Sequence, residues 1–265
     1  MKATKRFNNG FTLIEVLISM LISTVMVSIA IGQLVSSRTL YGLQEADTRI
    51  EENARYALEL LSSNIRMAGY KNTHLTATGG AENITQQFFT GDCPGAFTSC
   101  TSDGAGNTTD HLAIVLDPET NVTCTGVAVG VNDIIANLFF IAQDNGINSL
   151  RCRSYTITNN STATGIAGSE ATLIEGIENM QILYGIADPT DSEKKVASYV
   201  SATNVTDWGR ITAARITLLV GTGYNDNVDT SNSRSFTLAD ATTTAFTDSN
   251  RRKIFSTTTV IRNGS

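Results

Sequence analysis

The sequence has few of the residues on which most active sites depend. It contains only two histidines among 265 residues, His74 and His111, and neither lies at metal-ligand spacing to a second histidine or to a cysteine. The nucleophile-elbow pattern Gly-x-Ser-x-Gly and the phosphate-loop pattern Gly-x-x-x-x-Gly-Lys-Ser/Thr are both absent. We therefore expect no enzyme, no bound cofactor and no metal site.

Charged residues are missing from a long stretch near the N-terminus. Lys2, Lys5 and Arg6 are followed by no acidic residue before Glu15, and no charge occurs from Val16 to Ser37, a span of 22 residues rich in Val, Leu, Ile and Met. Such a span is long enough to cross a bilayer as a helix. By the positive-inside bias, we expect the N-terminus in the cytoplasm and the rest of the chain exported.

Glu15 does not fit a plain membrane anchor. A carboxylate near the start of an apolar helix is costly in hydrocarbon, so it indicates a function and a partner. The alternative is an ordinary signal anchor in which Glu15 lies at the level of the lipid headgroups.

The residues around Glu15 carry a resemblance to a known family. Gly10-Phe11-Thr12-Leu13-Ile14-Glu15, behind a basic leader and ahead of an apolar helix, resembles the processing site of type IV pilin-like precursors. The resemblance implies cleavage by a prepilin peptidase after Gly10, N-methylation of the new N-terminal Phe11, and transfer of the helix from the membrane into a filament.

The motif can also be explained by electrostatics, independently of the resemblance. Cleavage after Gly10 creates a positive amine on Phe11, and the amine of one subunit can meet the Glu15 carboxylate of a neighbour if the subunits are staggered. Each charge alone is expensive in an apolar medium, and pairing removes much of that cost. We therefore interpret Phe11 and Glu15 as assembly residues that set the register between subunits.

Composition agrees with one exported globular domain behind an anchor, at 41% hydrophobic and 17% charged residues. Removing the leader leaves 16 Lys and Arg against 25 Asp and Glu, a net charge of −9. This acidity disfavours broad binding to nucleic acid or anionic lipid, so no nucleic-acid partner is expected.

The four cysteines all follow the apolar span. An even number in an exported region favours disulfides over metal binding, and the alternative is four reduced thiols. Of the three possible connectivities, we favour Cys93 with Cys100, which closes a short loop, and Cys124 with Cys152, which ties two predicted strands together.

The helical pattern continues beyond Ser37 and becomes amphipathic, with no proline from Phe11 to Ala68 and a glycine stop at Gly69. A continuous helix of this length would extend about 87 Å. We predict a cleaved leader at 1–10, a transmembrane or filament-core helix at 11–37, its amphipathic continuation at 38–69, and a periplasmic β-rich globular domain at 70–265. The apolar positions of the continuation recur every three or four residues: Leu43, Ala46, Ile50, Ala54, Ala57, Leu58, Leu61, Ile65 and Ala68.

Strand patterns dominate the second half of the chain. Asp144-Asn145-Gly146 separates two of them and predicts a hairpin turn. We expect irregular loop at 71–110 with one short element at 84–89, and polar surface loops at 187–210 and 221–250. The amphipathic helix then packs on a mainly antiparallel sheet, which is the α+β class. The predicted strands are 111–116, 134–143, 148–155, 172–186, 211–220 and 253–262.

Within the superfamily, the chain is most similar to PilW-type minor pilins. The similarity rests on Ile65-Arg66-Met67-Ala68-Gly69-Tyr70, on 174–185 (IEGIENMQILYG) and on the ending Val260-Ile261-Arg262-Asn263. The chain departs from the family in lacking a cysteine soon after Tyr70, where Lys71 to His74 follow instead. A disulfide at this point is therefore not expected.

The resemblance implies a structural role. A minor pilin would sit as a single-pass protein in a bacterial inner membrane with its C-terminal domain in the periplasm, and then join a pilus (fimbrium) used for twitching motility. Its expected partners are other minor and major pilins, the prepilin peptidase, the inner-membrane assembly platform and the lipid bilayer. Two alternatives remain open: a J-like minor pseudopilin of type II secretion, or a filament-tip module that binds a surface or DNA.

Two further features have simpler readings. The acidic loop with Asp188, Asp191 and Glu193 has the residues of a calcium site without the spacing of an EF-hand, so a solvated turn is favoured. Trp208 either forms an exposed aromatic contact with another subunit or packs over one edge of the core, and we favour the second interpretation.

Overall fold

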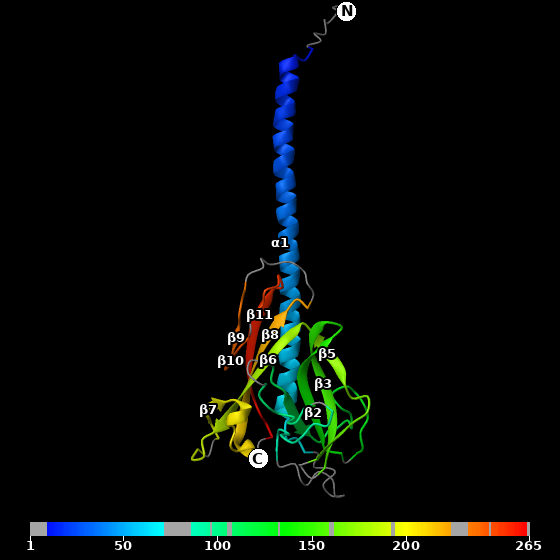
Figure 1. Ribbon diagram of the computed structural model, residues 1–265, viewed down its shortest axis with the longest axis vertical. Helices are drawn as coiled ribbons and strands as arrows, with labels where there is room; N and C mark the ends of the chain where they lie inside the picture. The colour runs from blue at the N-terminus through cyan, green and yellow to red at the C-terminus, as the bar shows by residue number, and fades with distance from the viewer. Residues whose placement is uncertain are drawn as a thin grey trace, which may run out of the picture. The chain divides into compact units, whose positions relative to one another are not determined.

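The computed structural model describes residues 10–71, 86–95, 97–104, 108–131, 133–158, 162–191, 194–223, 233–243 and 245–263. The chain divides into two compact units, an N-terminal unit, Met1–Glu45, and a globular unit, Ala46–Ser265. The described elements are one long α-helix, two main antiparallel sheets, a small hairpin and short 3-10 turns (Figure 1). The predicted α+β class, with a long N-terminal helix and mainly antiparallel strands, is confirmed.

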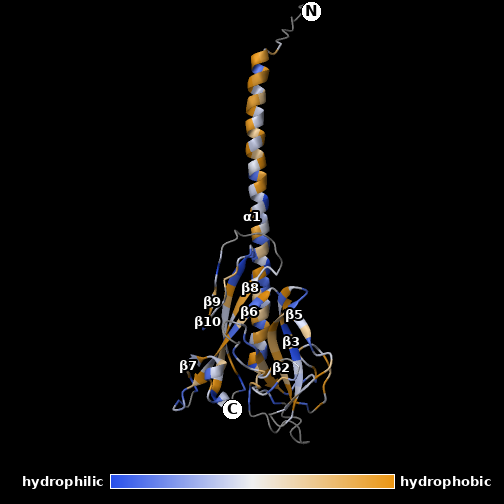
Figure 2. Cartoon of the chain, in the orientation of Figure 1, coloured by the Kyte–Doolittle hydropathy of each residue, from blue (hydrophilic) through white to orange (hydrophobic). Residues whose placement is uncertain are grey.

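The helix α1 spans Leu13–Met67, and the N-terminal unit contains its apolar part. Figure 2 shows this part largely in orange, the colour of hydrophobic residues, with paler segments between. Its serine and threonine hydroxyls donate back to carbonyls of the same helix, as Ser19 does to Val16 and Ser23 to Ser19. Because the hydroxyls are satisfied internally, they do not prevent the helix from entering an apolar medium. An 18-residue window reaches a mean hydropathy of 2.3, so by length and composition the helix can cross a membrane.

Inside the globular unit, α1 buries one face at the predicted three- and four-residue spacing. The helix ends at Met67, close to the predicted end, because Gly69 follows in the left-handed conformation with φ of 75°. The Gly69 N–H then donates to the Val115 carbonyl at 2.8 Å, which fixes the helix end to the first sheet. The buried residues are Ala46, Ile50, Ala54, Ala57, Leu61, Ser62 and Ile65.

The first sheet has five strands in the order β1-β2-β3-β4, with β5 pairing to β3. The turn between β2 and β3 confirms the predicted hairpin, since Asp144 pairs with Ile147 and the two turn residues, Asn145 and Gly146, have φ of 50° and 85°. The strands are β1, Leu112–Leu116; β2, Ile135–Asp144; β3, Ile147–Thr158; β4, Thr162–Gly165; and β5, Ala171–Glu175.

The second sheet has four strands in the order β11-β8-β6-β7. The prediction of one strand over 172–186 was wrong, because Gly176 separates β5 of the first sheet from β6 of the second. Only a residue without a side chain fits here easily, at φ of 80° and close to the carbonyl of Gly221. The strands are β6, Ile177–Ala187; β7, Val196–Val200; β8, Ile211–Gly221; and β11, Arg252–Val260.

Two of the predicted loops contain short elements. Between β6 and β8 lie β7 and the 3-10 turns η2, Ala202–Asn204, and η3, Trp208–Arg210. The described end of the other loop forms the hairpin of β9, Thr237–Leu238, and β10, Ala241–Thr242. Periodicity did not predict these elements because most are only two to five residues long.

Two apolar cores hold the globular unit together. The larger core joins α1 to both sheets through residues such as Leu61, Ile114 and Ile216. The smaller core lies on the opposite face of the first sheet, where Phe89 and the cysteines Cys93 and Cys100 cover outward-facing side chains of the strands. Residues 86–95 and 97–104, which fall in the region predicted as irregular loop with one short element, therefore form a covering layer for the first sheet.

Candidate functional site

The helix begins with a capping box formed by Thr12 and Glu15. The backbone N–H and the hydroxyl of Thr12 each donate to Glu15 Oε2 at 2.9 Å, and the Glu15 N–H donates to Thr12 Oγ1 at 3.4 Å. This reciprocal pattern satisfies donors that a helix N-terminus otherwise leaves free. Thr12 is a site residue that the sequence-based prediction did not include, although Thr-x-x-Glu ahead of an apolar run is the signal for this box.

The capping box leaves one side of the Glu15 carboxylate open. Among the described residues, no donor bonds to Glu15 Oε1 and no cation pairs with Glu15. Phe11 is 88% exposed and its nitrogen is a peptide amide in this unprocessed chain. The structure thus brings Glu15 together with Thr12, and it leaves Phe11 and Glu15 without a bond to each other.

An apolar surface follows the capping box. The large hydrophobic side chains of this part of the chain are about half exposed or more. A surface of this kind is unfavourable in water, so it requires lipid or other helices to cover it. The exposed residues are Phe11, Leu13, Ile14, Val16, Leu17, Ile18, Met20, Leu21, Ile22, Val25, Met26, Val27, Ile29, Ile31, Leu34, Val35, Leu40 and Tyr41.

Disulfides join Cys93 to Cys100 and Cys124 to Cys152, which are the two pairs that the sequence favours. The first closes a loop in which Cys93 and Phe97 exchange both backbone hydrogen bonds, so it fixes the layer that covers the first sheet. The second holds the long β1–β2 connection against β3. Both therefore restrict loops that have little regular structure of their own.

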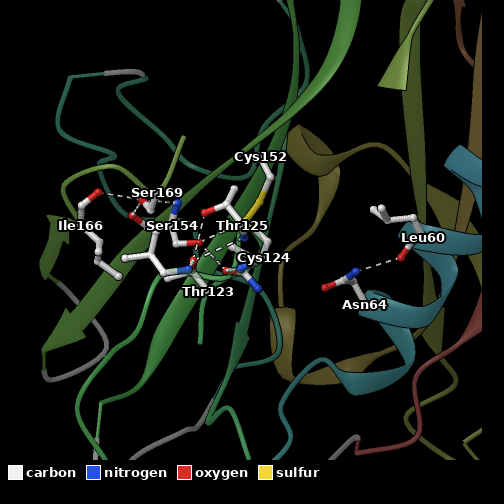
Figure 3. Close-up of a disulfide and its surroundings, with 11 residues drawn as sticks. Leu60, Asn64, Thr123, Cys124, Thr125, Cys152, Ser154, Ile166 and Ser169 are labelled. Atoms are coloured by element: carbon white, nitrogen blue, oxygen red, sulfur yellow. Dashed lines mark hydrogen bonds between the residues drawn. A yellow bond between two sulfur atoms is a disulfide. The ribbon is translucent and has the colours of Figure 1, made fainter. Parts of the chain in front are cut away.

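The Cys124–Cys152 disulfide lies beside a buried polar cluster (Figure 3). The Ser154 hydroxyl contacts Cys124 Sγ at 3.1 Å and donates to Asn137 Oδ1 at 2.6 Å. Cys124 and Asn137 also line a pocket of about 400 Å³ that reaches to Asn64 near the end of α1, and its walls include Met67 and Leu116. Its lining also includes Tyr70, Asp117 and Glu119, and the Tyr70 hydroxyl donates to Glu119 Oε1.

A buried carboxylate joins the two sheets. Asp110 is 3% exposed, and its oxygens accept from the Gly104 N–H at 2.9 Å and from the Ile182 N–H of β6 at 2.8 Å. Its own N–H donates to the Met180 carbonyl. Burial raises the pKa of Asp110 to about 7, with the Asp103 carboxylate adding to the rise and the two amide donors opposing it.

This pKa predicts a stability that falls as the pH rises. The folded chain keeps the Asp110 proton up to about pH 7, whereas the unfolded chain loses it near pH 4, so the free energy of unfolding decreases between these values by up to about 4 kcal/mol. Urea unfolding of the natural protein and of Asp110→Asn, measured from pH 4 to 8, tests this. As the pH rises, the free energy of unfolding of the natural protein should fall relative to that of Asp110→Asn. Profiles that run parallel from pH 4 to 8 would contradict the raised pKa of Asp110.

The remaining candidate residues have structural positions. The His111 ring stacks on Phe97 at 3.9 Å between centroids, and burial lowers its pKa, so it stays neutral near pH 7. Trp208 packs edge-on against Tyr184 at 4.9 Å and joins the larger core, in agreement with a covering role. His74 and Glu193 lie outside the described residues, and among those described no group of three His, Cys, Asp or Glu side chains is placed to hold a metal.

Comparison with known proteins identifies two matching families. Residues 138–263 match the family described as type IV pilus-assembly protein W, and residues 5–31 match the prokaryotic N-terminal methylation motif. No curated protein matches the chain in sequence. The structure of a type IV-like pilin from Thermus thermophilus is similar over 82% of this chain and 99% of its own length, at 11% sequence identity and a TM-score of 0.44. By the two family matches, the chain resembles a type IV pilus-assembly protein of the W type with a prepilin methylation motif.

Proposed function

We propose that this protein is a minor pilin that initiates or caps assembly of a type IV pilus. The observation that carries the proposal is the exposed helix surface, without charge from Val16 to Ser37, headed by a single carboxylate with one open side. The methylation motif over residues 5–31 supports processing of the N-terminus, and the match over 138–263 supports an assembly role.

Processing would convert the helix N-terminus into an ion-pairing site. In the proposed sequence of events, the chain enters a bacterial inner membrane with its globular unit in the periplasm, and the prepilin peptidase cleaves after Gly10. The Phe11 nitrogen becomes an amine, which is then methylated. Glu15 Oε2 is held by Thr12, so Oε1 remains for the Phe11 amine of a neighbouring pilin.

The pair would also explain why a charged residue is tolerated at this position. An unpaired carboxylate and an unpaired amine both resist transfer into an apolar filament core, and each removes the cost of the other. Helix surfaces without charge associate in many registers, whereas the charged pair permits one. The proposed partners are accordingly other minor and major pilins, with the inner-membrane assembly platform moving the helix out of the bilayer.

Variants of Glu15 and Thr12 test the role of the charge. Glu15→Gln keeps an oxygen that accepts from Thr12 but removes the charge, whereas Thr12→Ala weakens the capping box and keeps the charge. We expect Glu15→Gln and Glu15→Val to insert and be cleaved normally and to enter filaments at least tenfold less, since loss of one charge pair exceeds about 1.4 kcal/mol. Thr12→Ala should enter filaments at nearly the natural level.

Two results would contradict the proposal. Normal incorporation of Glu15→Gln, measured by immunoblotting of sheared filaments, would show that the residue serves only as a helix cap. A protein purified from cells with active peptidase that still begins at Met1, as read by mass spectrometry, would exclude processing. A deletion strain distinguishes the appendages, because loss of twitching indicates a pilus and loss of enzyme export indicates type II secretion.

A further inference from the structure

The last strand, β11, forms one edge of the second sheet. It pairs with β8 over all nine residues without a register shift. The Ile261 N–H donates to the Thr212 carbonyl just beyond the strand, which fixes the alternation of the ladder. Residues 253, 255, 257 and 259 therefore bond to β8, and the N–H and C=O groups of residues 254, 256, 258 and 260 point away from it.

The outward-pointing groups have no partner among the described residues. No backbone hydrogen bond connects Ile254, Ser256, Thr258 or Val260 to another described segment. The side chains of the same four residues are exposed, with Ile254 at 41% and Val260 at 64%. After the end of α1, the large hydrophobic residues exposed in the described chain are these two and Val131. The edge thus combines free backbone groups with exposed apolar side chains.

The other described edges of the two main sheets are protected. Along β1, the edge is covered by Gln87 to Phe89, whose backbone bonds to Ala113 and Val115. The edge strand β7 has five residues, a register shift in its pairing and Lys194-Lys195 before it. Strands β4 and β5, which both pair with β3, have four and five residues, and the pairing of β5 also has a register shift. Short length, irregular pairing and lysine are the usual ways to prevent strand addition.

None of these protections applies to β11. From Ile254 to Val260 the strand has no proline, no charge and no bulge. The charges at its start are already engaged, since Arg252 pairs with Glu178 and Lys253 pairs with Glu51 at 2.9 Å. We propose that the edge of β11 binds an extended strand from a neighbouring pilin-type subunit, which lengthens the second sheet by main-chain hydrogen bonds.

The composition of the β11 edge indicates what kind of strand it can bind. An uncharged edge disfavours a charged strand, because the charges would lose water without gaining a counter-ion. The partner should be uncharged over about seven residues, apolar opposite Ile254 and Val260, and polar opposite Ser256 and Thr258. This inference rests on the proposed function, since a neighbour held by its own N-terminal helix is present at high local concentration and can bind through a weak ladder.

Amide exchange on the full-length protein tests the inference directly. Deuterium uptake at residue resolution is compared between the detergent-solubilised protein and the assembled filament. We expect the amides of Ser256 and Thr258 to exchange at least tenfold more slowly after assembly, while the Thr257 amide, already bonded to β8, changes little. Outward amides that are slow before assembly, or fast after it, would overturn the inference.

Variants at the edge provide a second test. Thr258→Pro removes an N–H that β8 does not use, and Val260→Lys adds a charge to the exposed face, so both should fold. Each should lower incorporation into filaments about tenfold. Val131→Lys, which adds the same charge at a similarly exposed apolar residue away from the edge, should not. Equal effects of Val131→Lys and Val260→Lys would overturn the inference.

Photo-crosslinking identifies the occupant. A crosslinking residue at Thr258 should join to an edge strand of a chain that has its own prepilin motif, and one at Val131 should not. Crosslinks to a helix, or to a protein without the motif, would count against strand addition. If Glu15 variants fail to assemble while the outward β11 amides still exchange fast in filaments of the natural protein, only the edge inference is lost. If the natural protein never enters a filament, the proposed function itself is lost.

Discussion

Replacing Gly176 by alanine is expected to cost the globular unit at least about 3 kcal/mol of its free energy of unfolding. A Cβ at this position would lie 2.7 Å from the Gly221 carbonyl oxygen, closer than such atoms approach in proteins. The left-handed φ of 80° adds roughly 1–2 kcal/mol of strain for any residue other than glycine. Relief would require movement of the backbone where the Gly221 N–H donates to the Gly176 carbonyl at 2.8 Å.

Gly146 is the matched control for this substitution. It has a similar φ of 85°, and a Cβ there would meet no atom within 4 Å. Gly146→Ala should therefore lose only the conformational term, about 1–2 kcal/mol. Urea unfolding of the two variants compares them, and equal losses would show that the contact with Gly221 is relieved without cost.

The second large effect is expected at Arg252. Its side chain is 5% exposed and forms ion pairs with Glu178, which is 8% exposed, and with Asp248 at 2.6 Å. Its guanidinium also lies over the Phe246 ring at 3.9 Å. Arg252→Met should cost about 3–5 kcal/mol of unfolding free energy, because it leaves the buried Glu178 carboxylate without its counter-ion.

Two comparisons separate this cost from a general loss of charge. Arg251→Ala removes the neighbouring pair with Asp47, whose side chains are about 30% exposed, and should cost no more than about 1 kcal/mol. The double variant Arg252→Met with Glu178→Leu should recover much of the loss, since no uncompensated charge remains. A double variant as unstable as Arg252→Met alone would contradict this account.

The pH dependence of Arg252→Met gives a further check. Burial raises the pKa of Glu178, and the Arg252 guanidinium opposes this rise. Without Arg252 the folded chain holds the Glu178 proton to higher pH than the unfolded chain does. The loss of stability in the variant should therefore be larger at pH 8 than at pH 5.

Local patterns in the sequence predicted the elements whose signals lie within a few residues. The repeat from Ala46 to Ile65 predicted the buried face of α1, and Asn145-Gly146 predicted the β2–β3 hairpin. Such signals are readable because the residues that determine them are neighbours along the chain. Thr12 and Glu15 carry a signal of the same kind, and the capping box was predictable from their spacing.

Contacts between segments that are distant in the sequence could not be predicted from local patterns. The run from Thr172 to Ile186 has the composition of one strand, and its division at Gly176 depends on the approach of Gly221 from β8. Asp110 has no distinguishing local pattern, and its role as a joint depends on Ile182, 72 residues away. In both cases, the decisive partner is far along the chain.

The sequence by itself determined the apolar N-terminal helix, its N-terminal methylation motif, the amphipathic continuation and the α+β class, because hydrophobic period and charge distribution are properties of adjacent residues. Only the tertiary structure decided that the strands form two sheets joined at Gly176 and Asp110, that Arg252 is buried among acids, and that β11 is left as an open edge. These features depend on which backbone groups meet across the fold. A strand whose outer N–H groups are free can have the same sequence as a strand whose N–H groups are all paired, so the sequence does not distinguish them.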